Sequence, residues 1–136
     1  MFFGNKGNKP QNRIDCLIGA GTMIEGNVTF TGGLRIDGHV RGNVMTAGDK
    51  PGTLVLSEQA CVEGEIRVSH VVINGKVIGA VHAVEYVDLQ AKANVTGDVY
   101  YRTFEMQLGA VVQGRLVPQA EVMSANVVAL KPVSAE

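Results

Sequence analysis

Apolar and polar residues alternate along much of the chain, and a glycine recurs at a fixed place in this alternation. The repeated unit is apolar-x-Gly-x-apolar, as in Ile24-Glu25-Gly26-Asn27-Val28. Alternation with a period of two is typical of a β-strand that buries one face. The central glycines of the successive units are Gly26, Gly42, Gly64, Gly79, Gly97 and Gly114.

The spacing of these glycines predicts a β-solenoid. The steps between them are 16, 22, 15, 18 and 17 residues, and the long step contains the turn-rich segment Ala47-Gly48-Asp49-Lys50-Pro51-Gly52. Without this insertion every step is close to 17 residues, which fits a coil with three sides of about six residues each. An antiparallel sandwich would instead need hairpin turns every 8–12 residues. We therefore expect about six parallel coils, stacked about 4.8 Å apart over a length of about 29 Å.

The composition agrees with all-β structure and excludes several other classes. The chain has 136 residues, 46% of them hydrophobic, with 17 glycines. A count gives 21 valines but 8 leucines, the reverse of what a helical bundle favours. A disordered chain would be far less apolar. No run approaches 18 consecutive apolar residues, so we expect no membrane-spanning helix.

The two ends of the chain differ from its middle. Residues 1–13 carry three basic and no acidic side chains, and we interpret them as a disordered basic arm; residues 117–136 lose the glycine pattern and are expected to form a flexible tail, with a short helix over residues 121–130 as an alternative. Residues 14–116 form the expected solenoid domain. The net charge of -1 and the lack of an aromatic stacking surface argue against nucleic-acid binding. The arm lacks the apolar run of a secretory leader, so a cytoplasmic location with reduced cysteines is expected.

The candidate chemical groups do not form a recognisable catalytic set. His39 and His82 are expected to face outward into solvent, and Cys61 to be an ordinary surface thiol, whereas Cys16 precedes an apolar pair and is expected to be buried. There is no Ser-His-Asp order, no phosphate-binding loop and no metal-ligand spacing. Two cysteines alone make neither a disulfide scaffold nor a zinc site. We therefore expect no enzymatic activity, no cofactor, no metal and no nucleotide.

Two functions are alternatives to the self-assembly that is argued below from the ends of the solenoid. One is a left-handed β-helix acyltransferase of the hexapeptide-repeat type, or a non-catalytic homologue, because apolar residues recur every six positions from Ile18 to Ile36. The register drifts after Ile36, and only His39 or His82 could supply the catalytic histidine of that family. The other is an exported carbohydrate-binding solenoid, against which the missing leader and the absence of tryptophan argue.

The ends of the solenoid are the strongest candidate interaction surfaces. Neither end of the repeat carries an obvious amphipathic capping helix, and open strand edges with apolar side chains favour end-to-end stacking into filaments. Capping of the ends by the terminal tails is the alternative. The apolar residues that we expect at the contacts are Leu17, Ile18 and Ile24 in the first coil, and Phe104, Met106, Val112 and Leu116 in the last.

Three segments in order along the chain resemble the bactofilins, a family of small bacterial cytoskeletal proteins. They are Ile18-Gly19-Ala20-Gly21-Thr22-Met23-Ile24-Glu25-Gly26, Leu34-Arg35-Ile36-Asp37-Gly38-His39-Val40-Arg41-Gly42 and Gly97-Asp98-Val99-Tyr100-Tyr101. The resemblance covers about residues 14–116. It implies a right-handed β-helix that polymerises head to head and tail to tail, without nucleotide, into non-polar filaments. It also implies disordered tails and a scaffolding role for cell-shape or cell-wall machinery, with cell-wall or membrane proteins as partners.

The N-terminal arm fits the membrane contact that the resemblance implies. Its candidate lipid-binding residues are Met1, Phe2, Phe3, Lys6 and Lys9. A buried Phe contributes at most about 1.5–3 kcal/mol, and a Lys near an anionic leaflet about 1 kcal/mol. One arm is therefore a marginal anchor, but a filament displays many arms and gains affinity by multivalency. We expect a peripheral position at the inner face of the membrane; a disordered terminus with incidental aromatic residues is the alternative.

Overall fold

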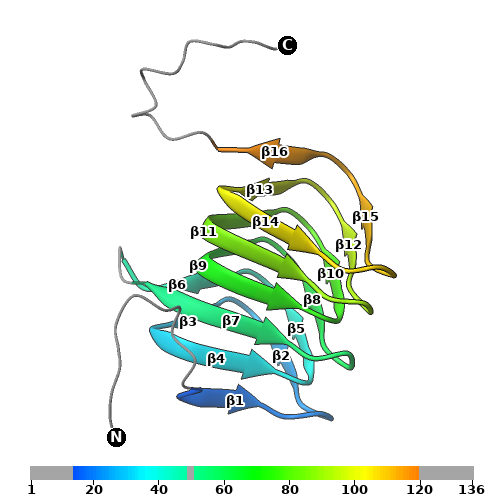
Figure 1. The fold of residues 1–136 in the computed structure, drawn as a ribbon. Helices are drawn as coiled ribbons and strands as arrows, with labels where there is room; N and C mark the ends of the chain where they lie inside the picture. The colour runs from blue at the N-terminus through cyan, green and yellow to red at the C-terminus, as the bar shows by residue number, and fades with distance from the viewer. Residues whose placement is uncertain (1–13, 49–50, 120–136) are drawn as a thin grey trace, which may run out of the picture.

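The fold is a β-solenoid of six coils, each with three short strands. The computed structural model describes residues 14–48 and 51–119, which form sixteen strands and no helix. All of the strand pairs are parallel. Figure 1 shows the coils stacked along one axis, with the first strand at one end and the last at the other. The predicted architecture and the predicted number of coils are confirmed.

The strands stack into three faces. The first face contains β1 (Cys16–Ile18), β4 (Gly32–Ile36), β7 (Gly52–Leu56), the second halves of β9 (Ile66–Ile73) and β11 (Val81–Leu89), and β14 (Thr103–Met106). The second face is a separate six-stranded sheet of β2 (Met23–Glu25), β5 (His39–Arg41), β8 (Cys61–Glu63), β10 (Lys76–Ile78), β12 (Asn94–Thr96) and β15 (Val111–Gln113). The third face contains β3 (Val28–Phe30), β6 (Val44–Thr46), the first halves of β9 and β11, β13 (Val99–Tyr101) and β16 (Leu116–Pro118).

The strands β9 and β11 bend around a corner and so join the third face to the first in one ten-stranded sheet. In Figure 1 the near strands all run in one direction while the chain rises toward its C-terminal end, which gives the solenoid a right-handed winding. This is the hand that parallel strands joined through a crossover almost always adopt.

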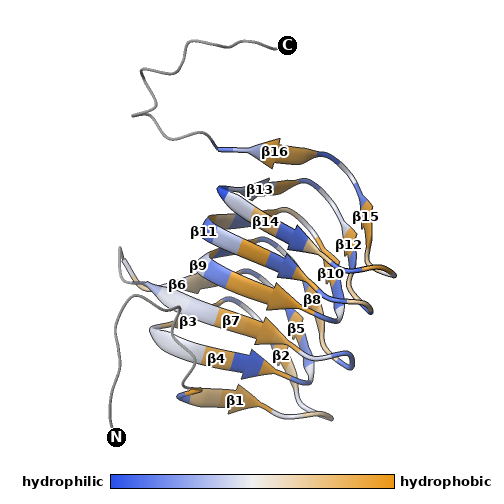
Figure 2. Ribbon diagram, in the orientation of Figure 1, coloured by the Kyte–Doolittle hydropathy of each residue, from blue (hydrophilic) through white to orange (hydrophobic). Residues whose placement is uncertain are grey.

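The core consists of ladders of inward-facing side chains, one from each coil. On the second face the inward residues are fully buried in the middle coils, as at Val40, Val62, Val77 and Val95. Figure 2 shows apolar residues recurring at equivalent places in successive strands, with polar residues between them. β-Branched side chains suit such ladders because they have few rotamers to lose on packing.

The structure requires glycine in the row from which the repeat was predicted. Each glycine of the row stacks on the previous one, so that a Cβ atom at Gly79 would overlap the carbonyl oxygen of Gly64. Gly79 also has a φ of 147°, a conformation that residues with a side chain rarely adopt. The same holds at Gly97, whose φ is 146°. Close backbone approach at this corner therefore explains the regular spacing in the sequence.

The insertion and the C-terminal boundary also follow from the strands. The expected insertion lies between the end of β6 at Thr46 and the start of β7 at Gly52. The backbone N–H of Gly52 donates to Ser69 Oγ at 2.8 Å, and this hydroxyl donates to Gly52 O at 2.7 Å, which fixes the point where the chain re-enters the coil. The last strand ends at Pro118, two residues past the expected end of the solenoid domain at residue 116.

Candidate functional site: the two ends of the solenoid

The exposed large apolar side chains gather at the two ends of the solenoid. Nine such residues are present in the part of the chain that the structure describes, and seven of them belong to the first or last coil or to the residues beside it. The seven are Ile14, Leu17, Met23, Met106, Leu108, Val111 and Leu116. Exposed apolar surface of this kind, concentrated rather than scattered, marks an interaction surface.

At the N-terminal end, the first coil covers the second and nothing among the described residues covers the first. Leu17 faces outward and is 57% exposed, whereas Ile18 faces inward and is buried, and Ile24 is half-buried. Cys16 is exposed, so the expectation that it would be buried is wrong. Its register partner is the buried Leu34, which shows that Cys16 does face the interior. It is exposed because the interior is open at this end.

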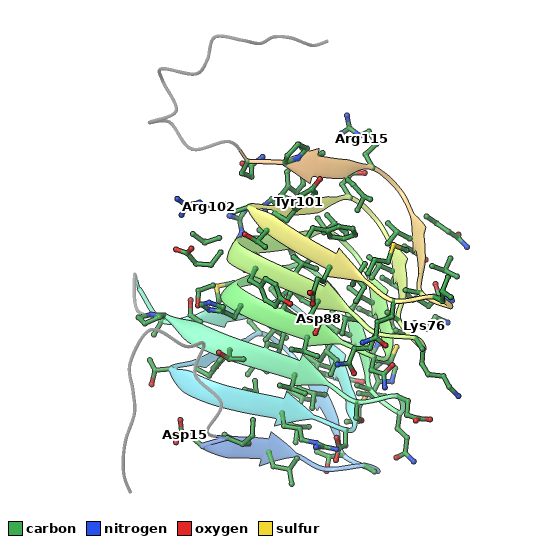
Figure 3. All side chains as sticks on the ribbon, in the orientation of Figure 1. Asp15, Lys76, Asp88, Tyr101, Arg102 and Arg115 are labelled. Carbon is green, nitrogen blue, oxygen red and sulfur yellow. The ribbon has the colours of Figure 1, made fainter. Side chains whose placement is uncertain are left out.

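Asp15 holds the start of the first coil against the second. Its backbone N–H donates to Gly33 O at 2.8 Å, and one of its carboxylate oxygens accepts from Gly33 N at 2.9 Å. These bonds fix the direction in which the chain enters the solenoid. Figure 3 shows Asp15 beside the terminal strand at this end and Arg115 at the opposite end.

The C-terminal end presents a larger apolar surface. Met106 is 43% exposed and Leu116 40% exposed, and Leu108 in the turn after β14 is 95% exposed. Phe104 and Val112 face inward but are only half-buried, because no further coil follows them within residues 14–119. The ring of Phe104 packs on that of Tyr101, with centroids 4.9 Å apart. The structure thus brings the predicted last-coil residues together at one end.

Val112 and Leu116 differ from the core residues in coverage and not in orientation. Val112 continues the ladder of Val95, and Leu116 that of Val99, both of which are fully buried one coil earlier. A second molecule placed on this end could bury the same side chains, at about 25 cal/mol for each Å² of apolar surface. Leu108 and Val111 were not among the residues predicted at this end, although their place in the last coil could have indicated them.

The histidines expected to be solvated are instead paired with glutamates of neighbouring coils. His39 Nε2 lies 2.8 Å from Glu63 Oε2, and His82 Nε2 lies 3.0 Å from Glu65 Oε2. Both histidines are on outward faces, as predicted, but half-buried. The Arg67 side chain also donates to Glu65 and, as the largest cause, lowers the pKa of its carboxyl.

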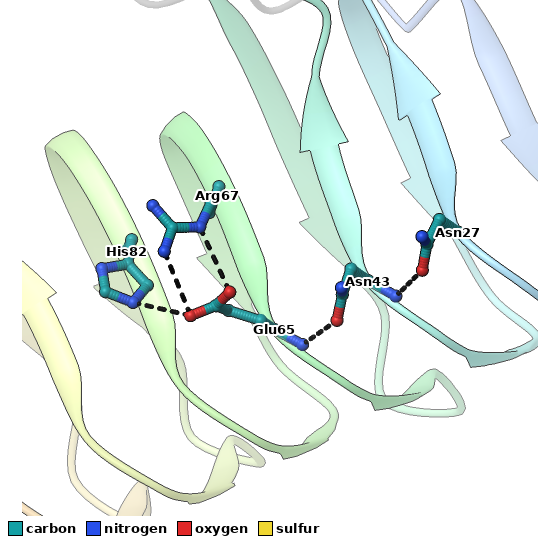
Figure 4. Close-up of polar contacts among 5 residues, drawn as sticks. All are labelled: Asn27, Asn43, Glu65, Arg67 and His82. Atoms are coloured by element: carbon teal, nitrogen blue, oxygen red, sulfur yellow. Dashed lines mark hydrogen bonds and ion pairs between the residues drawn. The ribbon is translucent and has the colours of Figure 1, made fainter.

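Figure 4 shows how these contacts continue a line of side-chain bonds across the coils. Asn27 Oδ1 accepts from the backbone N–H of Asn43, and Asn43 Oδ1 accepts from that of Glu65, both at 2.9 Å. Each bond joins one coil to the next. The polar contacts on this flank therefore hold the stack together.

One cluster on the second face was missed by the sequence analysis. Cys61 is outward-facing, as predicted, but half-buried, and burial is the largest cause that raises the pKa of its thiol. His39, Cys61 and Glu63 place one potential ligand atom each within 4.8 Å of one another. The signal was available, because His39 and Cys61 each stand three residues before a glycine of the row.

Parallel coils with exposed apolar side chains at both ends define a β-solenoid whose ends are candidate surfaces for self-association. A family model described as "Bactofilin: Polymer-forming cytoskeletal" matches residues 16–117, so the chain belongs to the bactofilin family. The chain is 25% identical over 100 residues to Bactofilin BacP of Myxococcus xanthus (strain DK1622), a match that covers 74% of this chain and 40% of the length of BacP. No solved structure matches the chain.

The family match confirms the predicted resemblance and assigns the chain to the polymer-forming cytoskeletal proteins. It therefore favours self-association over the acyltransferase and carbohydrate-binding alternatives. Within the described ranges there is no helix long and apolar enough to cross a membrane. The predicted lipid-binding residues Met1, Phe2, Phe3, Lys6 and Lys9, and the predicted tail beyond residue 119, lie outside the described residues.

Proposed function

We propose that this protein polymerises end to end, without nucleotide, into non-polar filaments in which first coils contact first coils and last coils contact last coils. The observation that carries the proposal is the concentration of exposed apolar side chains at both ends of the solenoid. Stacking would extend the inward ladders from one molecule into the next. Membership of a polymer-forming family supports self-association.

The two ends carry different apolar side chains, and we propose that each end contacts its own copy. The last coil offers large side chains, including Phe104, Met106 and Leu108, whereas the first coil offers Leu17 and Met23 around the open interior at Cys16. In a contact between like ends, a two-fold axis pairs each patch with its own copy. Because two different two-fold contacts alternate, the chain of subunits continues indefinitely and has no overall direction.

We further propose that the protein has no catalytic role. The two histidines that could serve an acyltransferase each have Nε2 hydrogen-bonded to a glutamate, His39 to Glu63 and His82 to Glu65. These contacts join neighbouring coils, which is a structural task. His39 and His82 thus contribute to holding the stack of coils together.

The N-terminal arm is proposed to attach the filament to the inner face of the cell membrane through Phe2 and Phe3, with Lys6 and Lys9 near anionic headgroups. Each arm binds weakly, but a filament displays many arms, and this multivalency raises its affinity for the membrane. A filament fixed in this way would scaffold cell-shape or cell-wall machinery through membrane or cell-wall proteins.

Sedimentation of the purified full chain after treatment with a nucleotide-degrading enzyme tests the assembly proposal. We expect the protein to pellet as filaments, with and without added nucleotide. A protein that remains monomeric at high micromolar concentration until nucleotide is added would overturn it.

A further inference from the structure

The cluster of His39, Cys61 and Glu63 lies on the second face, away from both ends of the solenoid. His39 in β5 and Cys61 in β8 are register partners, so they point outward side by side from adjacent coils. Glu63 lies two residues further along β8 and therefore points to the same side of the sheet. Two neighbours on one strand and a third on the next strand form a triangle of side chains.

We propose that His39, Cys61 and Glu63 bind a divalent transition-metal ion, with zinc as the best match. Their three ligand atoms lie within 4.8 Å of one another, and His39 Nε2 is 2.8 Å from Glu63 Oε2. A thiolate, an imidazole and a carboxylate are all established zinc ligands, and the combination with sulfur disfavours calcium and magnesium.

The geometry is compatible with a tetrahedral ion. Zinc binds sulfur at about 2.3 Å and nitrogen or oxygen at about 2.0–2.2 Å, so neighbouring ligand atoms lie roughly 3.3–3.8 Å apart. Small side-chain rotations would bring the three atoms from their present separations to these values. All three side chains are half-buried, so one side of the triangle stays open to water as a fourth ligand.

Two basic residues beside the cluster oppose cation binding. Arg41 Nε lies 3.8 Å from Glu63 Oε1, and Lys76 is the register partner of Cys61 on the other side. Glu63 interacts with Arg41 through Oε1 and with His39 through Oε2, so one oxygen is directed toward the proposed ion. The raised pKa of Cys61, which burial and then Glu63 cause, would be reversed by a bound cation.

The proposed ion would join two coils. His39 belongs to the second coil and the other two ligands to the third, and the chain between them contains the insertion of residues 47–52. An ion at this place would brace the coils across the longest step of the repeat. We therefore expect a structural effect of the metal and not a catalytic one.

Cobalt(II) titration of the purified full chain under reducing conditions is the first test. We expect a thiolate-to-cobalt charge-transfer band that saturates at one ion per chain, is abolished in Cys61→Ser, and needs roughly tenfold or more cobalt in His39→Gln and Glu63→Gln. His82→Gln is the matched control, because it breaks an equivalent His–Glu pair that has no cysteine beside it. Cys16→Ser controls for the other thiol.

Thermal unfolding in zinc gives a second measurement that does not depend on the band. Zinc should raise the melting temperature of the wild type and of Cys16→Ser, and leave that of Cys61→Ser unchanged, since a ligand of the native state stabilises by mass action. The proposal would be overturned if the wild type showed no cobalt band or if the band persisted in Cys61→Ser. It would also be overturned if His82→Gln weakened cobalt binding as much as His39→Gln does. Retained β-sheet circular dichroism verifies that each variant is folded.

Discussion

Cys16 and Phe104 stand at opposite ends of one inward-facing ladder of side chains. The register of the first face joins them through four buried residues, one from each intervening coil, namely Leu34, Leu54, Val71 and Val87. Cys16 is exposed and Phe104 half-buried, although both point into the core. The hydrophobic core thus reaches the surface at both ends, and this is the physical basis of the proposed assembly.

Cys16 should report contacts between first coils. Because it is exposed in the first coil, two copies would face each other across a two-fold contact. A short bismaleimide added to assembled protein should give covalent dimers and no longer species on a denaturing gel. The product should survive in Cys61→Ser and vanish in Cys16→Ser. Absence of the dimer from assembled wild type would contradict contacts between first coils.

The glycine row should tolerate no side chain at Gly79. A Cβ atom there would overlap the carbonyl oxygen of Gly64, at a φ of 147°. We expect Gly79→Ala to lower the free energy of unfolding by about 2–4 kcal/mol, measured by urea denaturation. Gly19→Ala is the matched control, since no atom lies within 4 Å of its added Cβ, and it should change stability by less than about 0.5 kcal/mol. Equal effects in both variants would refute the stacking argument.

Two aspartates should shift stability with pH in opposite directions. The pKa of Asp88 is raised, first by burial and then by Glu105, and its Oδ1 is buried without a hydrogen-bond partner among the described residues. Figure 3 labels Asp88 on the first face. The pKa of Asp37 is lowered, first by the hydrogen bond from Arg35. Both start from a usual value of 3.8.

Ionised Asp88 therefore destabilises the fold at pH values above its raised pKa. This destabilisation disappears below about pH 3.8, where the carboxyl is protonated in both the folded and the unfolded chain. Asp88→Asn should raise the melting temperature near pH 7, and the gain should shrink as the pH falls toward about 4. The contribution of Asp37 is present above 3.8 and is lost as the pH falls through its lowered pKa, so Asp37→Asn should lower the melting temperature near pH 7. Melting curves from about pH 3 to 8 measure both; shifts of the same sign would count against this assignment.

The N-terminal arm should be needed for binding to lipid and not for filament assembly. Deletion of Phe2 and Phe3 should remove most co-sedimentation of filaments with anionic liposomes, because each Phe contributes at most about 1.5–3 kcal/mol per arm and the loss recurs in every subunit. The filaments themselves should still form. Neutral liposomes control for the contribution of Lys6 and Lys9. Unchanged binding of the deletion variant would remove the arm from the membrane contact.

The sequence predicted the solenoid well because its constraint is local and repeated. The close approach that Gly79 makes to Gly64 recurs between every two adjacent coils, so the same backbone requirement for glycine appears five times along the chain, from Gly42 to Gly114. Inward and outward positions followed from alternation, and Cys61 was placed outward correctly.

The sequence could not show which end residues are covered, and the contacts between coils were missed. Cys16 faces inward, but whether it is buried depends on what lies beneath the first coil, which no local pattern records. The His39–Glu63 pair joins residues 24 positions apart across the insertion, so their contact depends on the exact register of β5 and β8. Alignment of the two strands on Gly42 and Gly64 would have shown it.

Electron microscopy of nucleotide-free filaments tests the end-to-end assembly most directly. Six coils about 4.8 Å apart span about 29 Å, so filaments of alternating contacts should repeat every two subunits, at about 58 Å, with the strands perpendicular to the axis. Phe104→Arg places a charge at the last-coil contact and should leave short species with an unchanged β spectrum, whereas Val84→Arg, on an exposed flank, should still form filaments. A polar repeat of about 29 Å, or long filaments of Phe104→Arg, would contradict the account.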